Sequence, residues 1–563
     1  MGRGNVNGGN PKEGGDLNKY LKPEGKEGAI LLKSNPLTLV EEEVTLTPLV
    51  FDFNIRITHF NVAFIFQNNF HLLFQYDNKN FLSTKSIRHA RIKVHIILRM
   101  YYFGTDGIRN QAQVLLDGQI PYLLGRALSE RGGKIIVARD VRTHSPEIEK
   151  QLCKGLLTGS AQIWLTGILP TPALAYVADM ENADFAVMIT ASHNAPSFNG
   201  LKVFGKNGSK LSLRDETALD ARLHEIENCN PELPQVDEDS VAADTLTYDE
   251  MTSALSIRLS KRNHRIRIVD GAQFLYAKHI KSMFPRFDGV KVRLDCAHGC
   301  FAELAPEIFE SLGAQVVAEN DIRDGEKVNV DCGSTHLDRF IPLVQKDEIG
   351  FAFDGDGDRV LAVVNGKAYD GDAILLALST LYRIQGKLRK KFVVGTTLTN
   401  TRLQRELAFQ NTALVRANVG DKYVLDTLRQ SNCLLGGEKS GHILMLDRAN
   451  TGDGIITALT LLEVRKTIGS LPKFTPYPML EFNIRCENPK DYAESGEFLS
   501  KVKLAEKEFG RKGRLIVRPS GTEPYIRIAF ECFSQDSVGI FEGVKKLFAE
   551  SDGENSLPSA RAK

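Results

Sequence analysis

Short apolar runs alternate with amphipathic segments along the chain from Met100 onward. The run KIIVARD precedes SPEIEKQLCKGLL, KVRLDCAHG precedes FAELAPEIFESLG, and KFVVGTTLTN precedes TRLQRELAF. A short apolar run that ends at turn residues is typical of a buried strand, and the amphipathic segment after it is typical of a helix that covers a sheet. These repeated strand-then-helix units predict several similar α/β domains rather than one large sheet.

The C-terminal part of the chain has a different pattern. LEFNIRC and RLIVRPSGTEPYIRIAFEC are typical of an antiparallel sheet, and a helix is predicted from Asp536 to Glu550. The three prolines of SLPKFTPYPML indicate a short extended connection before these strands. We therefore predict four domains around one cleft, three α/β and the last α+β, at 100–268, 269–370, 371–478 and 479–550, with a tail at 551–563.

Residues 1–99 differ from both patterns. The first 30 residues are rich in Gly, Lys and Glu and are predicted to be disordered. Apolar and polar residues alternate from Phe51 to Phe66 with one slip of phase, which is strand periodicity. Two interpretations stay open: a hairpin-like appendage, or translated non-coding sequence upstream of a start near Met100.

Composition and charge narrow the function. The 563 residues exceed the size at which one hydrophobic core stops growing, which agrees with several domains. The formal charge is +1 and the charges are interspersed, so nucleic acid is not an expected partner. Eight cysteines without a CxxC pair fit a reducing cytoplasm, and neither a signal peptide nor about 18 uninterrupted apolar residues indicates export or membrane spanning. The oligomeric state is left open.

The segment FAFDGDGDRV carries the sharpest chemical signal. Asp354, Asp356 and Asp358 alternate with glycines directly after an apolar run, so three carboxylates crowd at a strand end. Their repulsion favours a bound cation, and three carboxylates leave room for waters or a phosphate oxygen, which favours Mg²⁺ in a phosphoryl-transfer site. A calcium-binding EF-hand loop is excluded because Arg359 and Asn365 stand where it needs Gly and Glu. The alternative is an acidic, Gly-rich surface turn.

A second strand-end loop lies in VMITASHNAPSFNGLKVFGKNG and contains Ser192 and His193. Alone, such a serine can be only a helix cap or a turn former. Asn199, Gly200 and Lys202 follow closely, and they add a small-residue loop and a cation near a hydroxyl that could carry phosphate. The loop is therefore a candidate for covalent phosphoryl transfer.

The segment GGEKSGH has the residue types that contact a sugar. It sets Glu438, Ser440 and His442 at alternate positions of a predicted extended segment. Alternate side chains of an extended segment point to one side, so all three can reach sugar hydroxyls. An ordinary turn is the alternative.

The segment RPSGTEPYIR has the residue types that hold a phosphate. It places Arg518, Ser520 and Thr522 around Gly521. A guanidinium, two hydroxyls and exposed backbone N–H groups suit a phosphate dianion. Here too, an ordinary turn is the alternative.

These four segments, in this order and together with FGTDGIRN at 103–110, resemble the α-D-phosphohexomutase family, and within it the phosphoglucosamine mutase branch. The resemblance runs from about Met100 to Glu550. Segments similar to the branch are PTPALAYV at 170–177, CGSTH at 332–336, RANVGDKYV at 416–424 and GGEKSGH, whereas RPSGTEP is general to the family. The resemblance implies the four-domain fold and a cytoplasmic isomerase that feeds amino-sugar nucleotide and cell-wall precursor synthesis.

The resemblance also implies a ping-pong mechanism. A phosphoserine gives its phosphate to the substrate, a hexosamine 1,6-bisphosphate turns over in the site, and the other phosphate returns to the serine. Ser192 is then the phosphate carrier and, with the three aspartates, a ligand of one Mg²⁺. Arg109 and Arg359 correspond to cations of the phosphoserine site, and Lys202 and His442 to the general acid and base in an order left open. Substrate contacts are implied for Glu438, Ser440, Arg518, Ser520, Gly521, Thr522 and Arg527.

The chain departs from the family pattern in three places. Ala195 stands where the family usually has Pro after Ser-His-Asn, Asn110 replaces the usual Gly after Gly-Ile-Arg, and the stretch between Thr467 and Glu481 is shorter than typical. None of these removes a catalytic group. The loop around Ser192 is expected to be less rigid for want of that proline, with Pro196 as partial compensation.

Two other functions are weighed against this one. A phosphoglucomutase or phosphomannomutase shares the chemistry and differs in the group at carbon 2 of the sugar. A non-catalytic sugar-phosphate sensor would have lost a metal-binding Asp, the serine or the phosphate-loop Arg, and none is missing.

Overall fold

The structure is a computed structural model that describes residues 102–104, 106–229, 263–388, 391–486, 488–519, 524–533 and 536–549, and the backbone of strands at 50–55, 71–75, 90–97, 249–252 and 255–259. The chain forms two units, Met1–Tyr102 and Phe103–Lys563. Outside the described residues lie the predicted disorder of the first 30 residues, the second half of the Phe51–Phe66 pattern, the tail, and Ser520, Gly521 and Thr522.

The first unit contains a small antiparallel sheet in the described part. Its strands are β1 (Val50–Ile55), β2 (His71–Gln75) and β3 (Ala90–Ile97), in the order β1-β3-β2. β1 confirms the strand periodicity that begins at Phe51, and it pairs along its whole length with β3.

The first sheet of the second unit has the order β4-β8-β7-β5-β6-β11-β10-β9. Its strands are β4 (Ile108–Gln111), β5 (Lys134–Arg139), β6 (Gln162–Ile168), β7 (Phe185–Ile189), β8 (Phe198–Phe204), β9 (Asp249–Thr252), β10 (Leu255–Leu259) and β11 (Ile266–Asp270). Parallel pairing joins β7, β5, β6 and β11, and the remaining strands pair antiparallel at the two edges. β11 ends at Asp270, just beyond the domain boundary predicted at 268.

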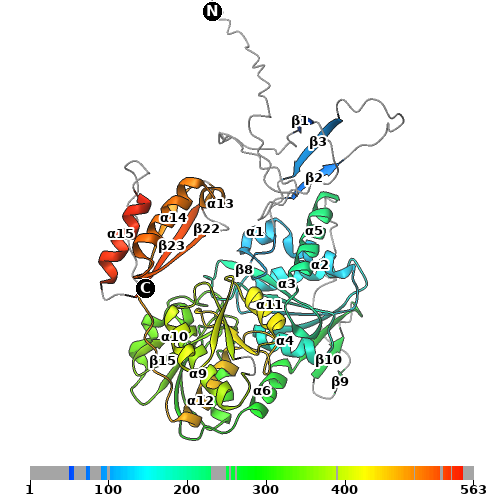
Figure 1. The fold of residues 1–563 in the computed structure, drawn as a ribbon. Coiled ribbons are helices and arrows are strands. Elements are labelled where there is room, and N and C mark those ends of the chain that lie inside the picture. Colours follow the sequence, from blue (N-terminus) through cyan, green and yellow to red (C-terminus); the bar gives the residue numbers. More distant parts are fainter. Residues whose placement is uncertain are drawn as a thin grey trace, which may run out of the picture. The chain divides into compact units, whose positions relative to one another are not determined.

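Helices cover this sheet on both faces. They are α1 (Ala112–Asp117), α2 (Ile120–Ser129), α3 (Ser145–Leu156), α4 (Thr171–Met180) and α5 (Leu213–Cys229). The chain passes from β5 through α3 to β6 on one side, then through α4 to β7 on the other side of β5. Right-handed crossovers in opposite directions put α3 and α4 on opposite faces (Figure 1). β5 and α3 confirm the first predicted strand-then-helix unit.

The second sheet has the order β13-β12-β14-β15-β16, with β12 parallel to both of its neighbours. Its strands are β12 (Lys291–Asp295), β13 (Gln315–Glu319), β14 (Ile349–Phe353), β15 (Val360–Val364) and β16 (Lys367–Tyr369). The associated helices are α6 (Ala272–Met283), α7 (Leu304–Ser311) and α8 (Leu337–Phe340). Every residue of β14 is buried, so the aspartates that follow it begin inside the protein.

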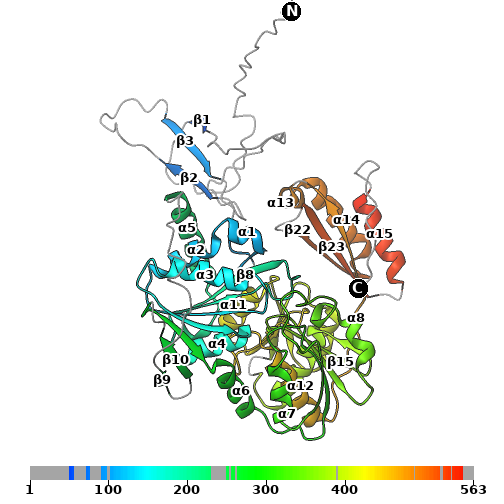
Figure 2. The same cartoon turned by 180° about the vertical axis from the view of Figure 1, so that it is seen from behind.

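The third sheet has the order β18-β17-β19-β20. Its strands are β17 (Phe392–Thr396), β18 (Ala413–Ala417), β19 (Leu435–Gly437) and β20 (Ile443–Met445). The associated helices are α9 (Gly371–Ile384), α10 (Thr401–Phe409), α11 (Asp421–Ser431) and α12 (Gly454–Ile468). One hydrophobic cluster runs through all three α/β domains and includes Ile136, Phe353 and Leu459, so they share a core. Figures 1 and 2 show the ribbons of these domains from the front and from behind.

The fourth sheet is antiparallel in the order β21-β23-β22, with strands β21 (Met479–Arg485), β22 (Gly513–Pro519) and β23 (Tyr525–Cys532). Helices α13 (Pro489–Ala493), α14 (Gly496–Phe509) and α15 (Ser537–Ala549) pack against it. This domain has its own hydrophobic cluster, which includes Phe498 and Phe530. Three α/β domains and a final α+β domain confirm the predicted fold class.

A buried carboxyl lies near the start of α9. Asp372 is fully buried, one of its oxygens accepts the Asn400 backbone N–H at 2.9 Å, and Oδ1 has no hydrogen-bond partner. Burial, with a smaller contribution from Asp370, raises the pKa of Asp372 to about 7. An unpartnered oxygen and a raised pKa both indicate that the fold favours the protonated carboxyl.

We expect Asp372→Asn to stabilise the protein above pH 7. The folded-state pKa lies above the unfolded value of about 3.9, so the stability that Asp372 contributes is complete below about pH 4 and is lost as the pH rises to 7. The amide stays neutral and avoids this loss, which is at most about 4 kcal/mol. Melting temperatures of Asp372→Asn and of the unmodified protein are measured from pH 4 to pH 8. The difference between the two proteins should increase up to pH 7 and stay constant above it. The exposed Asp338→Asn should follow the unmodified protein, and a pH-independent effect of Asp372→Asn would contradict the assignment.

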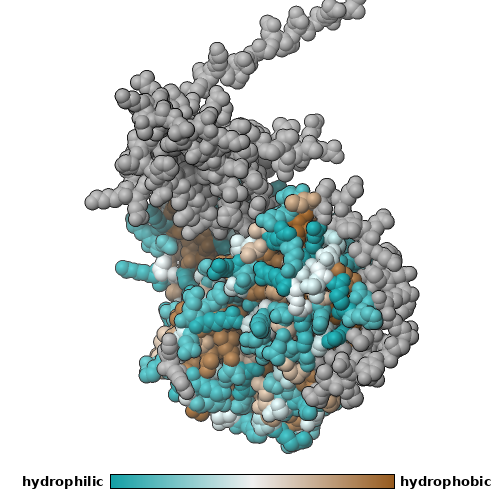
Figure 3. All heavy atoms as spheres, turned by 90° about the vertical axis from the view of Figure 1, so that its right-hand side faces the viewer, coloured by the Kyte–Doolittle hydropathy of each residue, from teal (hydrophilic) through white to brown (hydrophobic). Residues whose placement is uncertain are grey.

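The described surface is mostly hydrophilic in the view of Figure 3, where the hydrophobic areas are separate from one another. Exposed large apolar side chains such as Phe274, Ile322 and Phe409 are distributed over different elements. Among the described helices, none combines the length and apolar character needed to cross a bilayer. The eight cysteines are all described, and six of them are buried.

Candidate active site

The loop after β14 brings the three predicted metal-binding aspartates together. Asp354, Asp356 and Asp358 are buried, and one oxygen of each lies within 4.8 Å of those of the others. Oδ1 of Asp356 and Oδ1 of Asp358 are buried without a hydrogen-bond partner. Burial and the two neighbouring carboxylates raise the pKa of Asp354 well above its ordinary value. Buried, crowded carboxylate oxygens of this kind fit a hard divalent cation.

The glycines between these aspartates allow two close approaches. A Cβ at Gly355 would lie 2.9 Å from the carbonyl oxygen of Ser192. Gly357 has a φ of +77°, and a Cβ there would lie 2.4 Å from the ring of Phe301. Alternation of Asp and Gly is therefore required by packing as well as by the carboxylates.

Ser192 lies in the loop between β7 and β8 and is fully buried. Its Oγ donates a hydrogen bond to Oδ2 of Asp354 at 2.6 Å. Its backbone is left-handed, with φ of 54°, a conformation that costs a non-glycine residue about 1 to 2 kcal/mol. The fold thus holds the predicted phosphate carrier against the predicted metal-binding loop, although the two belong to different sheets.

Lys202, on β8, is a buried ammonium among carboxylates. Its Nζ lies 2.9 Å from Oδ2 of Asp356, 2.6 Å from Oδ2 of Asp358 and 3.3 Å from Oδ2 of Asp106. Burial would lower the pKa of Lys202, but the three carboxylates outweigh it and raise that pKa well above its ordinary value. Lys202 is therefore a charged ammonium that forms ion pairs with all three of these aspartates.

The GGEKSGH segment does not form the predicted extended structure. β19 ends at Gly437, β20 begins at Ile443, and the two strands run antiparallel, so the residues between them form a turn. The Gly441 N–H donates to the Glu438 carbonyl at 3.0 Å, and Gly441 has a φ of +90°. The prediction is wrong because this left-handed glycine reverses the chain.

The turn nevertheless places His442 in the site. His442 is buried, with Nδ1 3.6 Å from Oδ1 of Asp358 and Nε2 3.5 Å from Oδ2 of Asp421. Burial would lower the pKa of His442, but these two carboxylates outweigh it and raise the pKa. Glu438 accepts the Gly420 backbone N–H at 2.9 Å, whereas Ser440 is exposed at the tip of the turn.

Two predicted arginines border the serine loop and the aspartates. Nε of Arg359 lies 3.7 Å from Oδ1 of Asp358 and 4.0 Å from Oδ2 of Asp354. Arg109, on β4, donates to Oδ1 of Asn194 at 3.1 Å and to Oδ2 of Asp106 at 2.7 Å. Both guanidinium groups are therefore close to the place where a phosphate on the serine would lie.

The predicted phosphate-binding residues of the fourth domain are described only in part. Arg518 on β22 and Arg527 on β23 are directly opposite each other, so their side chains share one face of the sheet. Burial, and then Arg527, lower the pKa of Arg518, while Glu481 and Glu438 oppose this change. Two adjacent guanidinium groups are suited to an anion.

Several residues of the site were not singled out from the sequence. Oγ1 of Thr171 donates to Oδ2 of Asp356 at 2.5 Å, and Nζ of Lys210 is paired with both Asp106 and Asp421. Asp106, Thr171 and Asp421 lie in FGTDGIRN, PTPALAYV and RANVGDKYV, which marked the family resemblance. The resemblance of these segments to the family was the signal that could have pointed to the three residues. Local periodicity could not, because it assigns no role to a single residue.

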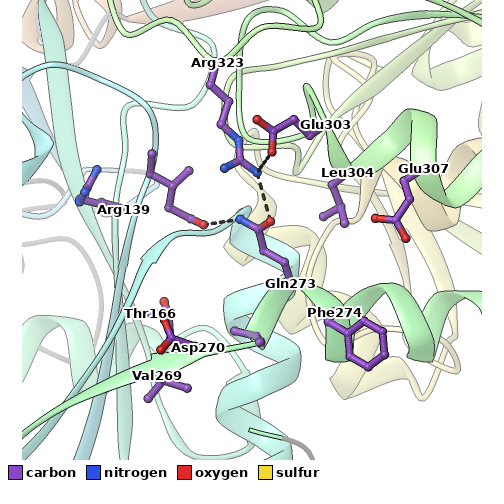
Figure 4. Close-up of a pocket in the computed structure, with 13 residues that line it drawn as sticks. Arg139, Thr166, Val269, Asp270, Gln273, Phe274, Glu303, Leu304, Glu307 and Arg323 are labelled. Carbon is purple, nitrogen blue, oxygen red and sulfur yellow. Dashed lines mark hydrogen bonds and ion pairs between the residues drawn. The ribbon is translucent and has the colours of Figure 1, made fainter. Parts of the chain in front are cut away.

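A cavity of about 600 Å³ is lined by the ends of β5, β6 and β11 and by residues at the starts of α6 and α7. Figure 4 shows Gln273 and Arg323 at this cavity, where Arg323 donates to the Gln273 side chain at 3.1 Å. Of the predicted site residues that the structure describes, none lines it. The cavity is therefore not the predicted substrate site.

Models of four phosphoglucomutase/phosphomannomutase domains match the chain in order. The alpha/beta/alpha domains I, II and III match residues 100–229, 275–367 and 370–473, and the C-terminal domain matches residues 481–541. Each model falls on one of the four described sheets of the second unit, and the strands β9, β10 and β11 of the first sheet lie between the first two matches.

Curated relatives match over most of their length. The phosphoglucosamine mutase of Caldanaerobacter subterraneus subsp. tengcongensis is 37% identical over 465 residues, which cover 79% of this chain and 97% of the relative. The phosphoglucosamine mutase of Neisseria meningitidis serogroup C is 36% identical over 461 residues, 77% of this chain and 96% of the relative.

Solved structures share the fold. A phosphoglucomutase/phosphomannomutase family protein from Burkholderia thailandensis has a TM-score of 0.62 at 22% identity, over 81% of this chain and 98% of that one. N-acetylphosphoglucosamine mutase of Aspergillus fumigatus, in complex with GlcNAc-6P and magnesium, has a TM-score of 0.53 at 17% identity, over 80% and 96%. Because four domain models match in order and relatives above 30% identity match nearly end to end, the chain belongs to the phosphohexomutase family of isomerases, on its phosphoglucosamine mutase branch.

Proposed function

We propose that this protein interconverts glucosamine 6-phosphate and glucosamine 1-phosphate in the cytoplasm, through a phosphorylated Ser192 and glucosamine 1,6-bisphosphate. The observation that carries the proposal is the 2.6 Å hydrogen bond from Ser192 Oγ to Asp354 within the buried aspartate cluster. It aims a hydroxyl at the place where a cation and a phosphate would meet. The names of the curated relatives favour the amino sugar.

The aspartate cluster supports one Mg²⁺ as cofactor. Asp354, Asp356 and Asp358 would hold it, with an oxygen of the phosphate on Ser192 as a further ligand. The buried Oδ1 atoms of Asp356 and Asp358 fit this assignment because neither accepts a hydrogen bond. When bound, the ion would act as a Lewis acid on the phosphoryl group that is transferred.

In the first half-reaction, the free hydroxyl of the monophosphate attacks the phosphorus atom of the phosphoserine. An O–P bond forms on the sugar as the bond to Ser192 Oγ breaks. Of Lys202 and His442, the neutral one takes the proton of the attacking hydroxyl, and the protonated one gives a proton to Ser192 Oγ. The second half-reaction reverses these changes at the other end of the sugar and returns a phosphate to Ser192. Lys202 Nζ and His442 Nδ1 lie 2.6 Å and 3.6 Å from the two oxygens of Asp358, so both lie beside the same carboxylate of the aspartate cluster.

The remaining predicted site residues would neutralise the phosphates and bind the sugar. Arg109 and Arg359 would neutralise the phosphate on Ser192, and Glu438 and Ser440 would bind the sugar hydroxyls. The phosphate that is not reacting would be held by the fourth domain, through Arg518, Ser520, Gly521, Thr522 and Arg527. The effect of Glu438 on the pKa of Arg518 supports this, because it puts the sugar-binding turn within electrostatic reach of the fourth domain.

The fourth domain is attached to the third near the start of α10. Glu531 on β23 accepts the Thr401 backbone N–H and, at 2.7 Å, the Thr401 hydroxyl, while Arg514 donates to the Thr399 carbonyl at 2.9 Å. Arg518 is four residues further along β22 than Arg514, a distance of about 13 Å. Attachment at one end of the strand pair and phosphate binding toward the other suit a domain that pivots to release and regrip the bisphosphate.

The sugar is tested with purified protein, Mg²⁺ and glucosamine, glucose or mannose 6-phosphate, each with its 1,6-bisphosphate as activator. We expect kcat/KM for glucosamine 6-phosphate to exceed the other two by at least about tenfold, since a site built for an amino group loses its contacts with a hydroxyl. A higher value with glucose or mannose 6-phosphate would assign a phosphoglucomutase or phosphomannomutase. Binding of all three without turnover would assign a sensor.

A further inference from the structure

A buried arginine lies beneath the serine loop. Arg142 follows β5, and its side chain has no exposed surface. Four of its five N–H groups donate to backbone carbonyls of the loop that carries Ser192, namely those of Ser192, Asn194, Ala195 and Phe198, at 3.0, 2.7, 2.5 and 2.9 Å. The fifth, Nε, donates to Oδ2 of Asp140 at 2.9 Å. All five N–H donors of this guanidinium are thus hydrogen-bonded, and four of them bind the same loop.

Asp140 connects the same arginine to the N–H of the serine. Oδ2 of Asp140 accepts the Thr190 hydroxyl at 2.8 Å, and the Thr190 Oγ1 accepts the Ser192 backbone N–H at 2.9 Å. Oδ1 of Asp140 accepts the Arg142 backbone N–H and the Ser145 hydroxyl. Both the N–H and the C=O of Ser192 are therefore tied to one buried ion pair.

This arrangement determines where the serine hydroxyl points. Ser192 is held in the left-handed conformation, and in that conformation its Oγ is 2.6 Å from Asp354. Rotation of the peptide groups around Ser192 would move this oxygen away from the aspartates. Arg142 also binds the carbonyl of Ala195, the residue that stands where the family usually has a rigid proline. Hydrogen bonds from Arg142 thus supply rigidity that the missing ring does not.

We propose that Arg142, through Asp140 and Thr190, is a positioning residue for phosphoryl transfer at Ser192. It acts on the rate at which the serine accepts and gives phosphate, and not on the affinity for the sugar phosphate. The inference rests on the proposed function, because it requires Ser192 to be the phosphate carrier.

The first test is Arg142→Lys. A lysine has three N–H groups on one nitrogen and cannot span four carbonyls and a carboxylate. The dephosphorylated protein is mixed with glucose 1,6-bisphosphate, and phosphate uptake on Ser192 is followed by intact mass. We expect the uptake rate to fall about a hundredfold, because a small displacement of a reacting group costs about this much in rate. The KM of the sugar monophosphate should change less than threefold.

Arg265→Lys is the matched control. Arg265 also donates to two backbone carbonyls, those of Leu157 and Gly159, and neither belongs to the serine loop. A loss of general stability would lower the melting temperature of both variants, whereas the phosphate-uptake rate should fall only in Arg142→Lys.

Thr190 provides a second test if Arg142→Lys does not fold. Thr190→Val keeps the side-chain shape and removes the hydroxyl that accepts the Ser192 N–H, whereas Thr190→Ser retains it. We expect phosphate uptake to fall by about tenfold or more in Thr190→Val and to be restored in Thr190→Ser. Uptake at the unmodified rate in folded Arg142→Lys, or in Thr190→Val, would overturn the positioning role. Absence of uptake by the unmodified protein would instead overturn the proposed function itself.

Discussion

Ser192→Ala should lower mutase turnover by at least about a thousandfold and leave the fold intact, because the variant keeps every other group and loses the phosphate carrier. The deleted oxygen donates to Asp354 and contributes little to packing. Turnover of glucosamine 6-phosphate and intact mass after incubation with glucose 1,6-bisphosphate measure the two consequences. The variant should neither turn over substrate nor gain the mass of a phosphate.

Ser197→Ala is the control for this experiment. Ser197 is on the same loop and exposed, so its loss tests the loop without touching the site. It should retain both turnover and phosphate uptake. Near-normal turnover in Ser192→Ala would exclude a phosphoserine at this position.

Asp356→Asn should raise the Mg²⁺ concentration that gives half-maximal turnover by at least about tenfold, because one of three charges is removed from a site built on charge. The Oδ1 atom of Asp356 is buried and unpartnered, so it is a free ligand position. Magnesium titrations of turnover, and calorimetry of Mg²⁺ binding to the protein without substrate, measure the change. Chelation of the unmodified protein should abolish turnover, and added Mg²⁺ should restore it.

Asp347→Asn is the matched control for the metal site. Asp347 belongs to the same domain, its side chain is 63% exposed, and it pairs with Lys291. Its substitution should leave the magnesium titration unchanged. The same titration in Asp356→Asn as in the unmodified protein would mean that the metal lies elsewhere.

Features with a local pattern were predictable from the sequence. β5 with α3, β12 with α7, and β17 with α10 all fall where apolar runs and amphipathic segments alternate. The same holds for α15, predicted at 536–550 and found at Ser537–Ala549. Strand and helix periodicity depend on neighbours within a few residues, so one sequence is enough to detect them.

Features that depend on one backbone angle or on distant partners were not predictable. The turn at Gly441 depends on a positive φ that the alternation of GGEKSGH does not reveal. Arg142 was not singled out, since its acceptors lie about 50 residues further along the chain and its only local signal is an ordinary strand end. Thr171 reaches Asp356 from 185 residues away. Such contacts are set by how the sheets pack together, which no local pattern encodes.

The two residues of the hydrogen bond between Ser192 and Asp354 are synthesised at different times. The two residues are 162 positions apart, and Asn329, which donates to the Ser192 carbonyl at 2.8 Å, lies 137 positions after the serine. At roughly 5 to 20 residues per second, a ribosome would add Asp354 about 10 to 30 seconds after Ser192. Throughout that interval the serine has neither the carboxylate that receives its hydroxyl nor the loop that would hold the metal. We therefore expect Ser192 to remain unphosphorylated on the nascent chain and to receive its first phosphate only after the second domain has been synthesised.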